Sequence, residues 1–304
     1  MRYSNSYIQS YKACPLQCFL KYEVGLEKVV EEVGEHHLAY GRAMHEGLKH
    51  LYLQDTLKSA QDAFLAAYPK QLDPEDKAKT REQGTQVLER YVKFWAEEDK
   101  KWRVLSVEEK ETFDYVEEGF TVKLDLVMEN KAYGGIYGFD HKVVGGRRAT
   151  LSFDFWNEFE PNSQITKYVS FIQSKHGECS GFYINALGMG FRSRAYKGEP
   201  AGFWTRFERQ MFNRNQSQLD LEQRDTVYWI TRIEDSKRTN LWGYNTSSCK
   251  FCHYRPICQA GWSWPEDQEL ITIQYLKTPK QPAPQVSEKE TLSADRSGIP
   301  SVET

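Results

Sequence analysis

Two aspartates and a lysine are the clearest candidates for chemistry in this sequence. Asp125 lies in a run of alternating apolar residues, and the pattern Asp-x-Lys, formed by Asp140 and Lys142, begins fifteen residues later. Two carboxylates can bind Mg2+ or Mn2+ through hard oxygen ligands, and a neighbouring lysine can orient or deprotonate a water molecule beside the ion. This chemistry suits hydrolysis of a phosphodiester bond. From these residues alone, a solvent-facing hairpin with ordinary surface charge is an equally good interpretation.

A group of cysteines near the end of the chain indicates a second site. Three cysteines follow the pattern Cys-x2-Cys-x5-Cys: Cys249, Cys252 and Cys258. Cys14 is the best candidate for a fourth ligand, with Cys18 and His253 as alternatives. Thiolates bind zinc or an iron–sulfur cluster, and the spacing does not distinguish the two.

A disulfide framework is a weaker interpretation of these cysteines. The chain opens with Met1-Arg2-Tyr3-Ser4 and shows no apolar signal segment. This favours a reducing, cytoplasmic location, in which clustered cysteines are more often metal ligands.

Two strand patterns position the acidic residues. The first covers 119–129, and five apolar residues share one of its faces: Phe120, Val122, Leu124, Leu126 and Met128. Asp125 therefore points to the opposite face. The second strand covers 135–144 and follows a turn-rich stretch that suits a hairpin. Because side chains alternate along a strand, Asp140 and Lys142 lie on one face.

Other patterns place further elements along the chain. Helices are expected over 5–24, 36–54 and 214–236, and a charged helical insertion over 55–100. Further strands are expected near 104–116, 180–188 and 201–210. A loop through 153–156 leads to a helix that contains Gln164. The tail from 277 to 304 is rich in Pro, Ser, Thr, Glu and Lys, which predicts disorder.

The two groups together resemble one family. Asp125, Asp140-His141-Lys142, the preceding Gly41-x3-His45 and the later Gln164-x3-Tyr168 are similar to the RecB-like branch of the PD-(D/E)XK nucleases. One early cysteine followed by Cys-x2-Cys-x5-Cys resembles the iron–sulfur subgroup of that branch, which includes AddB helicase-nuclease subunits and CRISPR-adaptation exonucleases. The resemblance extends from about residue 4 to residue 262.

The resemblance implies a role for each matching residue. His45, Asp125 and Asp140 would ligate Mg2+ or Mn2+, and the backbone carbonyl of His141 would be a further ligand. Lys142 would position the attacking water.

Two further groups of residues carry roles from the same resemblance. Gln164 and Tyr168, four residues apart, would face the site from one side of a helix. A 4Fe-4S cluster would be held by four cysteines: Cys14, Cys249, Cys252 and Cys258.

His141 departs from the family pattern, which usually has an aromatic or apolar side chain between the aspartate and the lysine. Strand alternation directs the His141 side chain away from the site, so we expect the chemistry to be unaffected. Glu109 shares strand parity with Val107 and Phe113, and it is either a residue facing the site or an ordinary edge-strand charge.

The predicted fold is an α/β restriction-endonuclease-like core, with a central mixed β-sheet flanked by helices. A chain of 304 residues with 39% hydrophobic content can form one elaborated domain. We expect a nuclease domain over 1–264, with the helical insertion at about 55–100 and a cluster segment over 245–262 that joins the two ends.

Charge and composition limit how the protein can bind nucleic acid. The net charge is −3, so contact with nucleic acid requires a local basic patch. Basic residues recur after the second strand: Arg147, Arg148, Lys175, Arg192, Arg194, Lys197, Arg206, Arg209 and Arg214. Aromatic residues are interleaved with them: Tyr183, Tyr196, Phe203, Trp204, Phe207 and Phe212. This combination suits single-stranded DNA or DNA ends.

The sequence thus predicts a metal-dependent DNA nuclease, in particular an exonuclease, that acts in recombination, repair or CRISPR-type DNA processing. It has no transmembrane run and no phosphate-cradling glycine loop, which argues against a membrane protein and against a built-in helicase motor. The alternative is a catalytically weak DNA-binding subunit of a larger complex, with a structural zinc or iron–sulfur site. A homo-oligomer is compatible with either.

Overall fold

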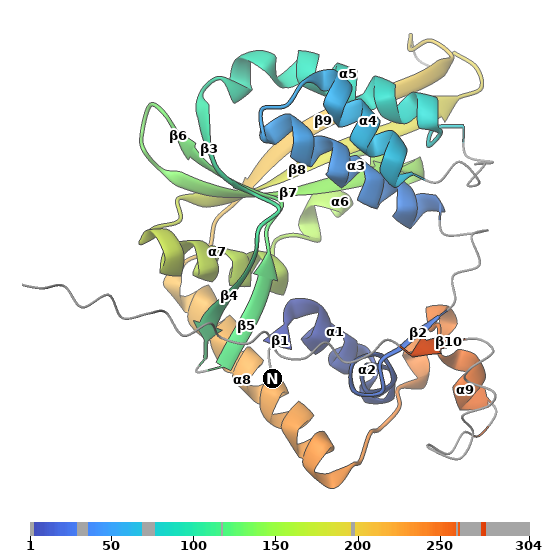
Figure 1. Ribbon diagram of the computed structural model, residues 1–304, viewed down its shortest axis with the longest axis vertical. Coiled ribbons are helices and arrows are strands. Elements are labelled where there is room, and N and C mark those ends of the chain that lie inside the picture. Colours follow the sequence, from blue (N-terminus) through green and yellow to red (C-terminus); the bar gives the residue numbers. More distant parts are fainter. Residues whose placement is uncertain are drawn as a thin grey trace, which may run out of the picture.

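A five-stranded mixed sheet forms the centre of the protein (Figure 1), in a computed structural model that describes residues 3–28, 36–68, 77–116, 118–195, 198–259, 261 and 275–277. Its strands, in spatial order, are β3 (Trp102–Val107), β6 (Leu126–Asn130), β7 (Ile136–Gly145), β8 (Gly181–Arg192) and β9 (Gly202–Phe212). β7 and β8 are parallel, and the other neighbours are antiparallel. The predicted mixed sheet and the predicted hairpin between the two acidic strands are confirmed.

Two small sheets lie beside the central one. The first has the order β1 (Tyr3–Ser4), β5 (Glu118–Lys123) and β4 (Lys110–Tyr115). The second pairs β2 (Leu26–Lys28) with β10 (Tyr275–Lys277), so a segment near the C-terminus lies against one near the N-terminus.

Three helices cover one face of the central sheet: α3 (His36–Tyr52), α4 (Leu57–Ala67) and α5 (Arg81–Asp99). α4 and α5 occupy the predicted helical insertion. Their apolar faces join the sheet in one hydrophobic core, in which Phe64, Leu88 and Phe139 are buried. Gly84 permits a close approach, because a Cβ atom there would lie 2.0 Å from the Phe64 ring.

The opposite face is covered by the connection between the parallel strands β7 and β8. This connection contains η2 (Gly146–Thr150), α6 (Phe153–Asn157) and α7 (Ser163–His176), and α8 (Gln216–Thr239) packs against α7. The expected loop through 153–156 is therefore wrong. That stretch forms a short helix, because Phe155 and Trp156 are buried in the core on this side.

The expected single helix over 5–24 is also wrong. It is divided into α1 (Asn5–Ala13), α2 (Pro15–Cys18) and the π-helix η1 (Phe19–Glu23). Pro15 disfavours a helical conformation in the residue before it, and Cys14 is extended with φ −164° and ψ 114°. The break turns the chain at Cys14, toward the C-terminal segment that contains η3 (Thr246–Phe251) and α9 (Arg255–Gln259).

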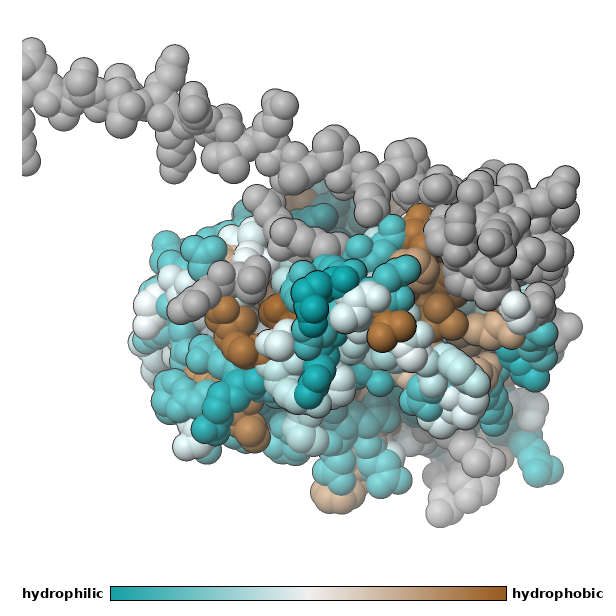
Figure 2. Space-filling view, turned by 90° about the horizontal axis from the view of Figure 1, so that it is seen from below, coloured by the Kyte–Doolittle hydropathy of each residue, from teal (hydrophilic) through white to brown (hydrophobic). Residues whose placement is uncertain are grey.

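The surface seen from below carries hydrophobic residues scattered among hydrophilic ones (Figure 2). On α8 the exposed apolar residues include Leu221, Val227 and Tyr228. Isolated apolar residues are common on protein surfaces. None of the described helices has the length and apolar composition needed to cross a lipid bilayer. The tail predicted to be disordered lies outside the described residues beyond Lys277.

Candidate metal centre

Two strand interruptions bring two carboxylates together. The strands expected over 104–116 and 119–129 are each broken, the first at Glu108 and the second at Asp125, so the prediction of two continuous strands is wrong. At the first break the chain passes from the central sheet into the small sheet of β4 and β5, and at the second break it returns to the central sheet. Glu108 has a positive φ of 53°, and its N–H donates to the Asp125 carbonyl at 3.0 Å. The two breaks are therefore linked.

His45 reaches these carboxylates from the middle of α3. Its Nδ1 atom is 3.4 Å from Asp125 Oδ2 and 3.6 Å from Glu108 Oε1. Among the described residues, these three are the group of histidine and carboxylate side chains whose ligand atoms all lie within 4.8 Å of one another. An imidazole nitrogen and two carboxylate oxygens suit Mn2+ or Mg2+.

Asp140 and Lys142 lie next to this group on β7. Their ion pair has a distance of 2.6 Å between Lys142 Nζ and Asp140 Oδ2. The Asp140 carboxylate is buried, and a buried charge is costly unless a cation or hydrogen bonds compensate it. Lys142 supplies one such cation, and a metal ion would supply a second.

The electrostatics of the centre favour a cation. Burial and the charge of Asp125 raise the pKa of Asp140 above its usual range. Burial also opposes ionisation of Asp125, but His45 outweighs it and holds the pKa of Asp125 low. Burial opposes the charged form of His45 as well, yet the two carboxylates raise its pKa to about 10. A divalent cation would relieve the repulsion between Asp125 and Asp140, so these residues fit a metal ion.

Gln164 and Tyr168 face the same region from α7. The Gln164 amide donates to the Tyr168 hydroxyl at 2.7 Å, and that hydroxyl donates to the Lys123 carbonyl at 2.8 Å. Lys123 ends β5, directly before the break that holds Asp125. Gln164 and Tyr168 therefore hold the chain in place at the strand break beside Asp125.

His141 contributes its backbone to the centre and its side chain to the opposite side of β7. Its N–H donates to Asp125 Oδ2 at 2.7 Å. The imidazole is buried, lies 2.7 Å from the amide nitrogen of Asn185, and stacks on Tyr52 of α3. This orientation is the one that strand alternation predicts. Burial lowers the pKa of His141 to about 3, so the ring is neutral.

A buried polar network extends from this imidazole to Arg209 on β9. The Asn185 amide donates to the Tyr91 hydroxyl at 2.6 Å, and Arg209 donates to Asp99 at 2.5 Å. Arg209 also donates to Tyr91 at 3.0 Å and to Tyr52 at 2.8 Å. The network joins helices α3 and α5 to three strands of the central sheet.

Several residues of the predicted DNA-binding patch therefore have structural roles inside the protein. Arg209 is held by the buried network, and Arg214 donates to the Phe159 carbonyl and to Thr166 at 2.8 Å and 3.0 Å. Phe207 and Phe212 are buried in the cores. Of the remaining members, Tyr196 and Lys197 lie outside the described residues.

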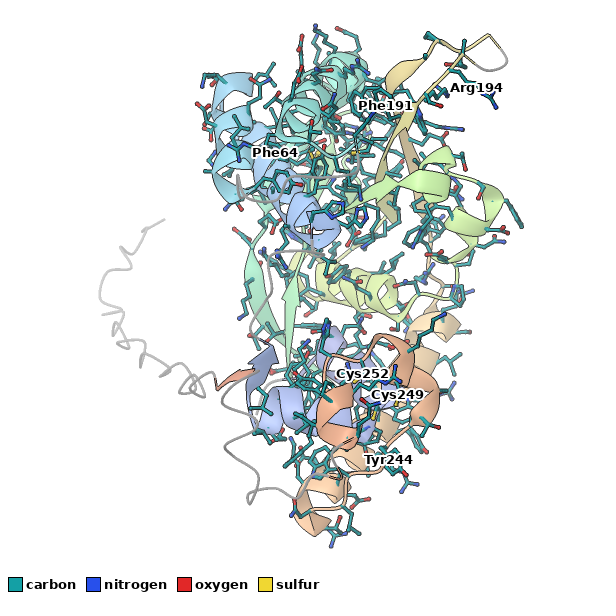
Figure 3. All side chains as sticks on the ribbon, turned by 90° about the vertical axis from the view of Figure 1, so that its right-hand side faces the viewer. Phe64, Phe191, Arg194, Tyr244, Cys249 and Cys252 are labelled. Carbon is teal, nitrogen blue, oxygen red and sulfur yellow. The ribbon has the colours of Figure 1, made fainter. Side chains whose placement is uncertain are left out.

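The four predicted cysteine ligands surround one small cavity, with a volume of about 20 Å³. Its lining includes Cys14, Cys249, Cys252 and Cys258. Figure 3 shows Cys249 and Cys252 at the end of the molecule remote from Arg194. Among the described residues, no three cysteine sulfurs lie within 4.8 Å of one another. The sulfurs of a tetrahedral zinc site would be separated by about 3.8 Å, given Zn–S bonds of about 2.3 Å.

Hydrogen bonds hold the two cysteine segments together. The Asn245 N–H donates to Cys14 Sγ at 3.4 Å, and Ser248 donates to the Ala13 carbonyl at 2.8 Å. Burial raises the pKa of Cys252 and of Cys258, and the other thiols of the group raise both further. A bound metal ion would lower the pKa values of these neighbouring thiols and favour their thiolate forms.

The alternative fourth ligands are placed elsewhere. Cys18 is buried, and its thiol faces the Tyr7 carbonyl at 3.8 Å. His253 is exposed. Neither belongs to the residues that line the cysteine cavity.

A mixed sheet with carboxylates and a lysine on neighbouring strands defines a class of metal-dependent hydrolases, and comparison with known proteins identifies the family. Residues 2–259 match the model of the PD-(D/E)XK nuclease superfamily. The chain belongs to this superfamily. None of the curated proteins matches it.

A solved structure supports the fold. A crystal structure named "Putative exonuclease", from Eubacterium rectale, matches with a TM-score of 0.50 and 13% sequence identity. The match covers 83% of this chain and 87% of that chain. At this identity the likeness shows a shared fold.

Proposed function

We propose that this protein is a metal-dependent DNA nuclease that acts as an exonuclease on DNA ends or single strands. The observation that carries the proposal is the convergence of His45, Glu108 and Asp125 beside the buried Asp140 and its partner Lys142. Membership of a nuclease superfamily supports hydrolysis of a phosphodiester bond.

Each residue of the centre has a part in the proposed mechanism. His45, Asp125 and Asp140 would hold the divalent cation, with Glu108 as an additional ligand or as the partner that fixes His45. When bound, Mg2+ or Mn2+ would polarise the scissile phosphate and lower the pKa of a water ligand. The N–H and C=O of one strand residue point to the same edge, so the His141 carbonyl is directed to the side of Asp125.

Lys142 would act as a positively charged hydrogen-bond donor. Burial opposes its charged form, but contact with Asp140 raises its pKa above the ordinary range. The ammonium group therefore stays protonated at neutral pH. It would orient the attacking water and stabilise charge on the phosphate, while Gln164 and Tyr168 keep the Asp125 segment in place.

For the cysteine cavity we propose a structural 4Fe-4S cluster held by Cys14, Cys249, Cys252 and Cys258. The cavity that these four cysteines share supports this choice. The cluster would fasten the C-terminal segment to the N-terminal helices. A role in recombination, repair or CRISPR-type DNA processing, within a larger complex or alone, is compatible with such a nuclease.

The proposed function is tested by digestion of end-labelled DNA. Anaerobically purified protein is incubated with single- or double-stranded DNA and Mn2+ or Mg2+, beside the Asp140→Ala variant. We expect the unaltered protein to shorten DNA from an end and the variant to leave it intact, because Asp140 is needed for metal binding. Equal cutting by both proteins would exclude this site, and absence of cutting by both would favour a DNA-binding subunit.

Glu108 provides a test of the metal centre itself. We expect Glu108→Gln to weaken Mn2+ binding by roughly 10- to 100-fold in isothermal titration calorimetry, a loss typical of ligands and their supporting groups. Glu109→Gln is the matched control, because Glu109 is exposed and pairs with Lys175 at 3.3 Å. Equal affinities for the two variants would remove Glu108 from the centre.

A further inference from the structure

The face of the central sheet that carries Asp140 and Lys142 continues toward the tip of the β8–β9 hairpin. Lys142 is opposite Ala186, and Gly190, four residues further along β8, is opposite Trp204. Residues opposite in register point to the same face of a sheet. Trp204 therefore shares the face of Lys142, at a distance of about 13 Å along the strand direction.

Trp204 forms a stack with Gly190 and Arg192 on this face. Its indole ring lies on Gly190, where an added Cβ atom would be 2.5 Å from the ring carbon Cζ2. Glycine is therefore required at position 190 for the ring to lie against the backbone. The guanidinium carbon of Arg192 lies 4.8 Å from the centre of a Trp204 ring. Arg192 also pairs with Glu199 at 3.5 Å, so both groups hold its orientation.

Arginine side chains lie between this stack and the metal centre. η2 lies over Gly188, whose added Cβ atom would be 2.5 Å from the Ala149 carbonyl oxygen. Arg148 of η2 is near enough to Lys142 to lower its pKa, and Arg206 donates to the Thr150 carbonyl at 2.8 Å.

Each of these arginines has a carboxylate partner: Arg148 pairs with Glu158, Arg206 with Glu208 and Arg192 with Glu199. Arg194 is exposed on the projecting hairpin (Figure 3). The stack thus lies at the end of a row of arginines that starts beside Lys142.

We propose that the Arg192–Trp204 stack binds an unpaired base of a DNA strand whose scissile phosphate lies at Asp140 and Lys142. The inference rests on the proposed nuclease function. Bases stack well on aromatic rings and guanidinium planes, and a base inside a duplex is already stacked on its neighbours. From Asp140 to Trp204 the sheet spans about 20 Å, given six strand residues. At the B-form rise of about 3.4 Å per nucleotide, this is up to roughly six nucleotides.

The test measures DNA binding in the Asp140→Ala background, which is not expected to cut. Fluorescence anisotropy with a labelled single strand should show that Trp204→Ala raises Kd by roughly 10-fold, as expected for loss of one stacked base. Trp204→Phe should lose less, and a blunt duplex should bind equally to all variants. Tyr228→Ala is the matched control, because Arg232 lies 5.3 Å from that exposed ring on α8, outside the sheet face.

Abasic substitutions locate the contact. A missing base at one position within the first six nucleotides from the scissile bond should weaken binding as much as Trp204→Ala does, and should have no further effect in that variant. If Trp204→Ala does not fold by circular dichroism, Arg192→Gln carries the same test, because it leaves the indole packed on Gly190.

The outcomes separate the two proposals. If the unaltered protein cuts DNA and the Trp204 and Arg192 variants bind single strands as tightly as their parent, the stack has no role and the nuclease assignment stands. If the unaltered protein neither cuts nor binds DNA, the proposed function fails, and this inference fails with it.

Discussion

Lys142→Met is expected to reduce DNA cleavage by on the order of 10²- to 10³-fold, the range found when a preorganised electrostatic group is removed from an active site. Methionine keeps most of the length and the apolar part of lysine but removes the charge and the hydrogen-bond donor. The loss should appear in kcat, because the ammonium group acts on charge that develops during the reaction. Single-turnover cleavage of end-labelled DNA measures it.

A matched control for this variant is Lys93→Met on α5. Lys93 is exposed and pairs with Glu89 of the same helix at 2.6 Å. It should cut at the unaltered rate and unfold at nearly the same temperature, since surface substitutions usually change stability by less than about 0.5 kcal/mol. A Lys142→Met protein that is folded and cuts like the control would exclude Lys142 from the mechanism.

The parts of the centre that depend on local periodicity could be predicted from sequence. Asp140 and Lys142 lie two residues apart on one strand, so alternation alone puts them on the same face. The same rule placed the His141 side chain on the other face of β7, where it contacts Asn185 and also lies with its ring centre 5.9 Å from that of His45. His45 lies far from these residues in sequence, and only the family resemblance indicated it.

Glu108 could not be predicted, because its position depends on a break within an otherwise regular strand pattern. Sequence alternation drew attention to Glu109, which faces solvent and Lys175. Glu108 instead adopts a left-handed conformation, uncommon for a residue other than glycine, asparagine or aspartate. Tertiary contacts fix this conformation of Glu108. Its N–H donates a hydrogen bond to the Asp125 carbonyl, and its carboxylate forms an ion pair with Lys123.

Arg209 shows a second limit of sequence patterns. Beside Phe207 and Phe212 it looks like part of a basic and aromatic surface, yet it is buried among Asp99, Tyr52 and Tyr91. A buried arginine and a surface arginine cannot be distinguished by type or spacing. The partners that keep Arg209 buried come from helices more than a hundred residues away, and sequence periodicity does not contain that information.

Cys258→Ser is the variant with the largest expected effect on stability. If Cys258 ligates a cluster, its loss removes binding energy that is coupled to folding of the terminal segments. We expect anaerobically purified variant protein to lose most of its iron and acid-labile sulfide. Its midpoint of thermal unfolding should fall by on the order of 10 °C, which at 2–4 °C per kcal/mol corresponds to roughly 3 to 5 kcal/mol.

The control for this prediction is Cys179→Ser. The Cys179 thiol lies 3.5 Å from the Gly181 carbonyl and outside the cysteine cavity, so this variant should keep its metal and nearly all of its stability. Zinc without sulfide in the unaltered protein would replace the 4Fe-4S proposal by a zinc site. Unchanged metal content and unchanged unfolding of Cys258→Ser would show that Cys258 is not a ligand. Because the cavity joins Cys14 to a segment more than two hundred residues later, loss of the cluster should expose both ends of the chain to proteolysis while the central sheet stays folded.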